Sequence, residues 1–322
     1  MSFRYRVATV FGGSGFIGRH LIKRLAKTGT IIRVATRHPS SANFLRTNGS
    51  VGQIVPIAVN INDDASVAAA VRDADIVINL IGILYESGVN SFTGTQGEAP
   101  GRIARLAKAA GAQRFIQISA IGADANSESA YARSKAAGEQ GVRKAFPEAT
   151  ILRPSIVFGP EDGFFNRFAA MARISPALPL IGGGHTKLQP VYVGDVADAI
   201  MKAIELPEAQ GKTYELGGPR VYTFKELMQL VLQETRRKRF LVPMPWSVAE
   251  FQGRILGKLP KPPLTEDQVL LLKNDNVVSP GAATLGDLGI QPTAAEVIIP
   301  TYLDRFRVGG RFSQRAGGYS AR

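Results

Sequence analysis

The 322-residue sequence contains no cysteine and only three histidines. The absence of cysteine excludes disulfide bonds, thiolate catalysis and cysteine-ligated metals, and three histidines are too few to point to a metal site. Long apolar runs are also missing. The longest, residues 76–84, contains Asn79 and Gly82, whereas a membrane-spanning helix needs about 18 or more apolar residues. We therefore predict a protein with no metal centre and no transmembrane segment.

Acidic residues are fewer than basic ones. The sequence has 26 Asp and Glu and 39 Lys and Arg, which gives a net charge of +13. Such an excess favours an anionic partner: a phosphate-rich cofactor, an anionic membrane surface or acidic protein neighbour, or nucleic acid. No nucleic-acid-binding motif accompanies the charge, so we expect no nucleic-acid partner. The first predicted strand begins near Arg6, which leaves no room ahead of it for a signal or transit peptide.

Apolar segments of strand length alternate with helical patterns over the first half of the chain. Strands are expected at residues 7–11, 31–36, 54–59, 76–81, 115–119 and 150–153. Fully apolar strands separated by helices indicate a parallel sheet covered on both faces, and right-handed crossovers wind it doubly. The sequence therefore predicts an α/β protein with a Rossmann-type sheet, whose ligands bind beyond the carboxyl ends of the strands.

A glycine-rich loop follows the first strand directly and opens a helix. Gly12 allows a tight turn, Gly15 has no Cβ to block a pyrophosphate, and Gly18 permits close packing of the helix on the sheet. Amides at the start of the helix attract phosphate, although a glycine turn without a ligand is the alternative. The predicted dinucleotide-binding residues are Gly12, Gly13, Ser14, Gly15, Phe16, Ile17, Gly18 and Arg19.

The end of the second strand indicates which dinucleotide binds. Thr36-Arg37-His38 occupies the place where a carboxylate normally holds a ribose 2′-hydroxyl. An acidic residue would repel a 2′-phosphate, whereas Arg37 would bind it, and Arg19 is near enough to reach the same phosphate. We therefore predict NADPH or NADP as the cofactor, with two solvated surface arginines as the alternative.

Ser119 ends the fifth predicted strand, and Tyr131 precedes Lys135 by four residues on the helix that follows. This spacing places the phenol and the ammonium on one helix face. A phenol with a pKa of ~10 exchanges protons poorly at neutral pH unless a cation such as Lys135 favours the phenolate. The three residues resemble the Ser, Tyr and Lys set of the short-chain dehydrogenase/reductase superfamily. The resemblance implies that Ser119 orients a substrate carbonyl and that Tyr131 and Lys135 contact the nicotinamide ribose, as catalytic residues or as vestiges of them.

The same resemblance implies cofactor contacts at other strand ends. Asp63 occupies a position that often contacts adenine in the superfamily, although it equally suits the cap of a helix. The remaining predicted contacts come from Asn60, Ile81, Gly82 and Pro154.

After about Phe158, proline and glycine become frequent and the helical segments shorten. We predict a Rossmann domain over residues 1–158, a smaller lid or substrate region over 159–300, and a basic tail over 301–322. Residues 188–205 are expected to return to the Rossmann core, and Asp195 is interpreted as a helix cap.

Two basic segments lie outside the predicted cleft. Residues 236–239 precede an apolar stretch with the only tryptophan, Trp246, and form either a surface-docking element or a solvated turn before a buried edge strand. The tail carries five arginines against one aspartate. It is either disordered or ordered against an acidic neighbour, which we favour, with four aromatic anchors: Tyr302, Phe306, Phe312 and Tyr319.

Several motifs together resemble one branch of the atypical extended short-chain reductases, the nucleotide-binding accessory subunits of respiratory complex I. The motifs span residues 11–20, 131–139, 146–149, 153–159 and 161–166. The resemblance covers roughly residues 5 to 300. It implies a tightly held NADPH, a peripheral position beside the membrane and a structural role. Two departures concern catalysis: Phe11 replaces the usual threonine, and residues 92–98 lack an expected asparagine.

The leading hypothesis is an NADP(H)-binding accessory subunit of a bacterial proton-pumping NADH:quinone oxidoreductase. Its partners would be the other subunits of complex I and an anionic membrane surface, on the cytoplasmic side of the inner membrane or the matrix side of a mitochondrion. One alternative is an NADP-dependent reductase or epimerase acting on a small carbonyl or sugar, with Tyr131 as acid and base. Another is a regulator that senses the NADPH pool.

Overall fold

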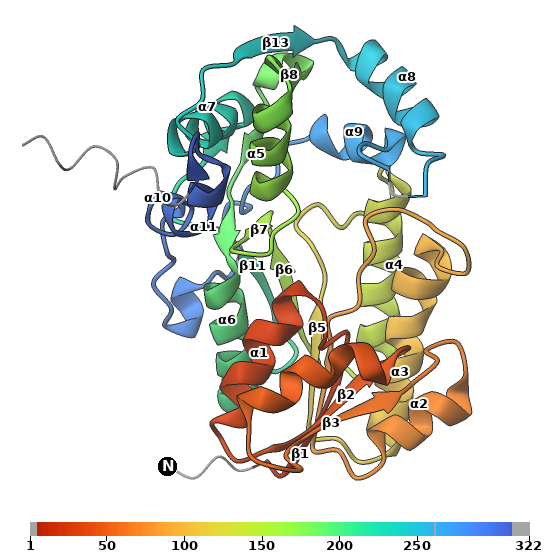
Figure 1. Ribbon diagram of the computed structural model, residues 1–322. Helices are drawn as coiled ribbons and strands as arrows, with labels where there is room; N and C mark the ends of the chain where they lie inside the picture. Colours follow the sequence, from red (N-terminus) through yellow and green to blue (C-terminus); the bar gives the residue numbers. More distant parts are fainter. Residues whose placement is uncertain (1–4, 261, 311–322) are drawn as a thin grey trace, which may run out of the picture.

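A seven-stranded parallel sheet forms the centre of the computed structural model, which describes residues 5–260 and 262–310 (Figure 1). The strand order is β11-β6-β5-β4-β1-β2-β3, and each neighbouring pair is parallel. The strands are β1 (Val7–Phe11), β2 (Ile31–Thr36), β3 (Ile54–Ala58), β4 (Ile76–Asn79), β5 (Arg114–Ile118), β6 (Thr150–Pro154) and β11 (Thr213–Leu216). The predicted doubly wound α/β fold is confirmed.

The six predicted strands all lie in this sheet, and their ends differ from the prediction by at most two residues. The seventh strand, β11, was not predicted, because its four residues include Tyr214 and Glu215 among polar neighbours. It pairs with β6 at the edge of the sheet. The sheet therefore draws a strand from beyond the predicted boundary at residue 158.

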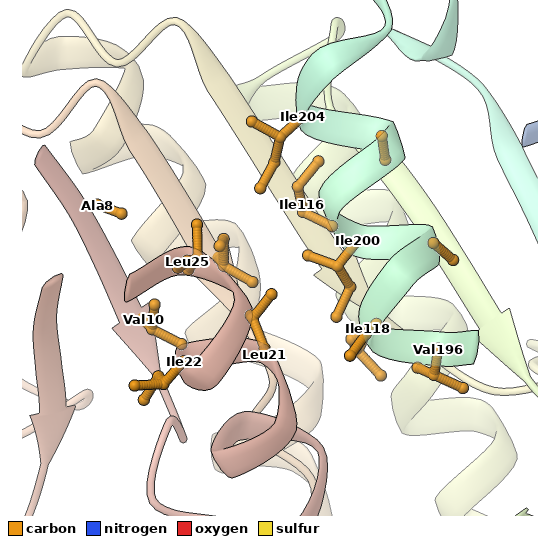
Figure 2. Packing of buried hydrophobic residues seen from close by; sticks show 14 of the residues in the cluster. Ala8, Val10, Leu21, Ile22, Leu25, Ile116, Ile118, Val196, Ile200 and Ile204 are labelled. Atoms are coloured by element: carbon orange, nitrogen blue, oxygen red, sulfur yellow. The ribbon is translucent and has the colours of Figure 1, made fainter. Parts of the chain in front are cut away.

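One face of the sheet is covered by α1 (Phe16–Ala26) and α6 (Val193–Glu205), which lie side by side (Figure 2). Their apolar faces pack on strand residues that point to the same side. Figure 2 shows this core, with side chains from Val10, Leu21, Ile22, Leu25, Ile116, Ile118, Val196, Ile200 and Ile204. The expected cap role of Asp195 is wrong. Tyr192 holds the N-cap position of α6, and the Asp195 carboxylate accepts hydrogen bonds from the Thr293 amide at 2.6 Å and hydroxyl at 2.9 Å.

The opposite face is covered by α2 (Asp64–Val71), α3 (Ala99–Ala109) and α4 (Ala130–Ala145). Phe11, Val77 and Phe115 point to this side, because successive strand residues alternate between the faces. Both faces of the sheet are therefore buried, as the apolar strands require.

A smaller region sits over the carboxyl ends of the strands (Figure 1). Its helices are α5 (Phe165–Ile174), α7 (Phe224–Glu234), α8 (Trp246–Leu256), α9 (Glu266–Leu272), α10 (Ala295–Ile298) and α11 (Pro300–Leu303). Its strands form three pairs: β7 (Val157–Phe158) with β10 (Val191–Tyr192), β9 (Lys187–Leu188) with β12 (Tyr222–Thr223), and β8 (Ala177–Ile181) with β13 (Phe240–Met244). None of the described helices combines the length and hydropathy that crossing a membrane requires.

Two predictions for the basic segments need correction. Residues 301–307 do not begin a separate tail, because Tyr302 and Leu303 are buried in the core of the smaller region. The Tyr302 hydroxyl donates to the Asp162 carboxylate at 2.6 Å, so its anchor lies within the chain. Phe306 is partly buried against the same core, and the other two predicted anchors, Phe312 and Tyr319, lie outside the described residues. The strand β13 is not a buried edge, since Phe240 is 78% exposed.

Candidate functional site

A cleft of about 1400 Å³ lies between the carboxyl ends of the central strands and the smaller region. It brings together predicted residues from seven separate segments of the chain. Those that line it are Gly12, Ser14, Gly15, Phe16, Ile17, Gly18, Arg37, Asn60, Ile81, Gly82, Ser119, Tyr131, Lys135 and Pro154. Gly13, Arg19 and Asp63 are not among its lining residues. Among the residues that the structure describes, no group of three or more His, Cys, Asp or Glu is arranged to hold a metal ion.

The glycine loop turns sharply between β1 and α1. Gly12 has a φ of +73°, and a Cβ placed on it would lie 3.2 Å from the Ile81 amide nitrogen. Gly15 is exposed in the cleft and is the N-cap of α1, where no side chain satisfies the amides and no acidic residue occupies the first turn. Such a helix end favours the binding of an anion, because its free amides and the positive end of its dipole both face the place where the anion would lie.

Gly13 and Gly18 have structural roles in the same loop. A Cβ on Gly18 would overlap the carbonyl of Gly13, so only glycine permits α1 to approach the loop this closely. A Cβ on Gly13 would lie 2.9 Å from the Ile22 side chain, inside the core. Gly13 therefore points away from the cleft and into the protein, and its predicted contact with the cofactor is not supported by its position.

The two arginines predicted to bind a 2′-phosphate lie in different surroundings. Arg37 lines the cleft at the end of β2 and is exposed, and its Nη1 donates to Asn90 Oδ1 at 2.7 Å. Arg19 instead lies 3.7 Å from the Glu161 carboxylate and above the Phe44 ring, 5.4 Å from its centroid. The structure therefore leaves Arg37 as the cleft arginine and directs Arg19 elsewhere.

Of the two predicted cofactor-binding residues that follow β3, Asn60 lies in the cleft and Asp63 does not. Asn60 lines the cleft, and so does Asn62, which the sequence analysis did not select. Asp63 is the N-cap of α2, and its carboxylate accepts a hydrogen bond from the Ala65 amide at 3.1 Å. The capping interpretation is therefore correct, and the predicted contact between Asp63 and adenine has no support in the geometry.

Ser119, Tyr131 and Lys135 all line the cleft. Ser119 follows β5 and is 4% exposed, and Lys135 on α4 is 5% exposed. The Lys135 Nζ lies 5.7 Å from the centroid of the Tyr131 ring, on the same side of the helix, as the spacing of four predicts. The Phe92 ring packs edge-on against Tyr131 at 5.9 Å. The sequence-predicted set is thus assembled in one place.

The electrostatics of this set differ from the expectation. Burial, with a smaller contribution from the nearby Asp267 carboxylate, raises the pKa of Tyr131 to about 12. Burial lowers the pKa of Lys135 to about 8, and the Glu139 carboxylate only partly opposes this effect. The expected lowering of the phenol pKa by Lys135 is therefore not seen in this structure, because desolvation and an acidic neighbour both raise that pKa.

Asp267 was missed by the sequence analysis, although it organises the start of α4. Its carboxylate accepts hydrogen bonds from the Ser129 hydroxyl at 2.8 Å, the Ala130 amide at 2.7 Å and the Tyr131 amide at 3.3 Å. A carboxylate at a helix N-terminus is favourable for the helix dipole. The same negative charge disfavours a phenolate on Tyr131. Because Asp267 is 136 residues away in sequence, no local motif could have revealed this contact.

Gln96 is the second residue that the sequence analysis missed. Residues 93–98 form a single π-helical turn ahead of α3 and bury Gln96 beside the cleft. The Gln96 Oε1 accepts from the Ile83 amide at 3.0 Å, and its Nε2 donates to the Ser134 hydroxyl at 3.3 Å. It fixes the strand-end loop that carries Gly82 against α4. A π-turn is frequent at functional sites, but the sequence offered no periodic signal for it.

The comparisons with known proteins agree with this architecture. The model of the NAD dependent epimerase/dehydratase family matches residues 8–217. Two solved structures are similar in fold: the UDP-glucose 4-epimerase of Thermus thermophilus in complex with NAD (TM-score 0.69, 21% identity, 93% of this chain and 98% of that one), and the dTDP-glucose 4,6-dehydratase DesIV of Streptomyces venezuelae (TM-score 0.71, 18% identity, 98% and 99%).

Sequence relatives are more specific. The chain is 39% identical over 316 residues to NADH dehydrogenase (ubiquinone) 1 alpha subcomplex subunit 9 of Arabidopsis thaliana, covering 94% of this chain and 79% of that protein. The mouse subunit 9 is 38% identical over 304 residues, covering 94% and 80%. A ceramide reductase of Caulobacter vibrioides is 29% identical over 241 residues, covering 74% of each chain. The chain therefore belongs to the NAD dependent epimerase/dehydratase family and, within it, to the group of the alpha subcomplex subunit 9 proteins of NADH dehydrogenase.

Proposed function

We propose that the chain is an NADP(H)-binding accessory subunit of the proton-pumping NADH:quinone oxidoreductase, with a mainly structural role. One observation carries the assignment to the complex: the 39% identity, over 94% of the chain, with a subunit of NADH dehydrogenase. The partners are then the other subunits of complex I. The location is the cytoplasmic side of a bacterial inner membrane, or the matrix side of a mitochondrial one.

The residues of the cleft fit NADP(H). The cradle at Gly12 and Gly15 leaves space that a Cβ would narrow, and it points free amides at the place of a pyrophosphate. Arg37 provides the positive charge that a 2′-phosphate requires, and Tyr131 and Lys135 are placed to hold the nicotinamide ribose. The dinucleotide supplies hydride chemistry in active enzymes. In this subunit its binding free energy stabilises the folded state.

The state of Tyr131 argues against a role as a general base. A general base must be deprotonated near the working pH, and a pKa raised to about 12 keeps the phenol protonated at neutral pH. The protonated phenol is a good hydrogen-bond donor to a ribose or a carbonyl oxygen. It is a poor base for an oxidation or an epimerisation.

The proposed contact with an anionic membrane surface is supported by α8 and β13, which lie together at the end of the molecule away from the N-terminus (Figure 1). The outer face of α8 exposes Val248, Phe251 and Ile255, with exposed fractions of 43%, 64% and 54%. Arg254 lies in the last turn of α8 and Lys258 follows it, while Arg236 and Lys238 precede β13. Apolar side chains beside basic ones favour the interface of an anionic bilayer.

Thermal unfolding with each dinucleotide tests the cofactor assignment. A ligand at about 100 times its Kd stabilises the folded state by about 2.7 kcal/mol, so NADPH should raise the Tm by several degrees, and NADH at the same concentration should raise it less. Equal shifts with both dinucleotides would remove the role of Arg37. No shift with either, in a protein shown to be free of bound nucleotide, would refute the cofactor assignment.

The rival function is an NADP-dependent reductase. Ser119, Tyr131 and Lys135 line one cleft, and a relative at 29% identity is a ceramide reductase. A protonated Tyr131 suits reduction, because the phenol donates its proton to the carbonyl oxygen. Consumption of NADPH with a carbonyl substrate, abolished by Tyr131→Phe, would establish this function. Its absence across a panel of aldehydes and ketones would favour the structural role.

A further inference from the structure

The cleft extends well beyond the dinucleotide-binding residues. Its volume of about 1400 Å³ exceeds the roughly 300–1,000 Å³ of pockets that hold one small ligand. The additional space lies under the smaller region, between α5, β8, α8 and α9. We call it the distal compartment and define it by Phe168, Met171, Ile181, Met244, Leu256 and Leu271.

Tyr131 stands at the junction between the two parts of the cleft. It begins α4 next to Asp267 of α9, whose carboxylate accepts a hydrogen bond from the Tyr131 amide at 3.3 Å. The glycine loop and Arg37 lie on one side of this junction, and the distal compartment lies on the other. A ligand in the distal compartment therefore has Tyr131 and Ser119 as polar neighbours at the end nearest the dinucleotide-binding residues.

The walls of the distal compartment are mainly apolar, although Gln252 of α8 and Gln268 of α9 also line the cleft. The defining phenylalanine, leucine, isoleucine and methionine residues come from five elements, α5, β8, β13, α8 and α9, and most of them are only partly buried by the protein itself. Met171 and Met244 are unbranched and adapt their shape to a flexible guest. Each CH₂ group that such walls remove from water strengthens the binding of an apolar ligand.

Two cations line this part of the cleft. Lys273 Nζ lies 2.7 Å from the Glu250 carboxylate, whereas Arg167 Nη1 donates to the neutral Pro263 carbonyl at 2.8 Å. A nucleotide sugar would bring a diphosphate into this space, and burying its charges without enough partners is costly. With Lys273 already beside a carboxylate, Arg167 alone is a poor match for a diphosphate.

We propose that the distal compartment binds an amphiphile with a long apolar chain, of the fatty-alcohol, acyl or prenyl class. The apolar chain of this ligand lies among the leucines of α8 and α9, and its polar end faces Tyr131. This proposal goes beyond the accessory role, because it assigns a second ligand to the cleft and does not depend on the identity of the dinucleotide.

A pyrene-labelled decanol is a suitable probe, because it is uncharged and its fluorescence reports an apolar environment. The full-length protein, loaded with NADPH, is titrated with this probe below its micelle concentration. We expect saturable binding of about one probe per chain and no displacement by UDP-glucose. Displacement by UDP-glucose, or no saturable binding, would overturn the proposal.

Two neighbouring positions of α8 provide a matched pair of variants. Leu256 lines the compartment, whereas Ile255 is 54% exposed and does not. Leu256→Glu places a charge in the apolar space and should weaken probe binding about tenfold or more, while Ile255→Glu should leave it within about twofold. Equal weakening in both variants would place the probe on the outer face of α8 and refute the proposal.

Leu271→Glu tests the opposite wall, formed by α9. Unchanged circular dichroism and NADPH affinity in each variant show that the protein is folded. The outcome is independent of the cofactor assignment: loss of NADPH binding with retained probe binding would contradict the proposed function alone. Retained NADPH binding without probe binding would contradict only the distal compartment.

Discussion

The positions of Arg37 and Arg19 determine which of the two guanidinium groups can bind the 2′-phosphate of NADPH. Arg37 faces the cleft, and Arg19 pairs with Glu161 outside it. Arg37→Glu should weaken NADPH binding by about ten- to hundredfold, because a charge-assisted hydrogen bond contributes about 1.5–3 kcal/mol. Binding of NADH should change much less. Isothermal titration calorimetry measures both affinities.

Arg19→Glu is the matched control, because it makes the same change of charge one turn of helix beyond the loop. It should leave the NADPH affinity within a few-fold of the wild type. If Arg19→Glu weakens NADPH binding as much as Arg37→Glu does, general charge attraction explains the effect and the specific role of Arg37 is wrong.

Lys135 gives a prediction about stability and pH. Burial lowers its pKa from 10.5 to about 8, so the unfolded chain binds more protons than the folded chain between these values. Stability from this group therefore rises with pH through that window. Above pH 10 the raised pKa of Tyr131 acts in the opposite direction, which leaves pH 8 to 10 as the informative range.

The comparison of wild type with Lys135→Met isolates this contribution. Between pH 8 and 10, in the nucleotide-free protein, the wild type should gain about 1 kcal/mol per pH unit relative to the variant. Urea denaturation at several pH values measures the difference. Parallel stability curves for the two proteins would show that Lys135 is not desolvated as the structure indicates.

At the scale of elements, the start of α4 depends on a residue from α9. Asp267→Ala removes a carboxylate that accepts hydrogen bonds from Ser129, Ala130 and Tyr131, and should destabilise the protein by about 1–3 kcal/mol. It should also lower the pKa of Tyr131, because the nearest negative charge is lost. Chemical denaturation and ultraviolet titration of the phenol measure the two effects.

Glu266→Ala is the control for this change, since Glu266 precedes Asp267 and its partner Arg254 is 66% exposed. An exposed salt bridge contributes about 0–1 kcal/mol, so stability should fall only slightly and the Tyr131 titration should not move. A phenol pKa that is the same in Asp267→Ala and the wild type would contradict the electrostatic account of the site.

The outer face of α8 makes the membrane proposal testable. Phe251→Glu replaces an exposed apolar side chain and should reduce binding to vesicles containing phosphatidylserine several-fold, measured by co-sedimentation. Val297→Glu, at an exposed position of α10, is the control and should bind as the wild type does. Equal vesicle binding by Phe251→Glu and the wild type would remove α8 from the membrane contact.

The elements differed in how well the sequence predicted them. Strands buried on both faces are fully apolar and were found, whereas β11 was missed because Glu215 is a polar residue in a buried strand. Its carboxylate accepts a hydrogen bond from the Ser279 amide at 2.8 Å and lies 3.5 Å from Arg153. Only tertiary contacts reveal that this glutamate is paired. The glycine loop was predictable because it is local, while Asp267 and Gln96 act through contacts distant in sequence.

At the scale of the whole molecule, two packed regions share one cleft. The sheet supplies the glycine loop and the Ser119, Tyr131 and Lys135 set, and the smaller region supplies the apolar walls and Asp267. A ligand that spans the cleft contacts both regions and so stabilises their arrangement. A bound dinucleotide that is not turned over would therefore still stabilise the folded subunit within a larger assembly.

The most direct test of the account is native mass spectrometry of the complex purified in mild detergent through a tag on this chain. The account predicts one copy of the chain together with NADH:quinone oxidoreductase subunits, and one NADP(H) released per chain on denaturation. A chain that purifies alone, or within the complex but without NADP(H), would contradict it.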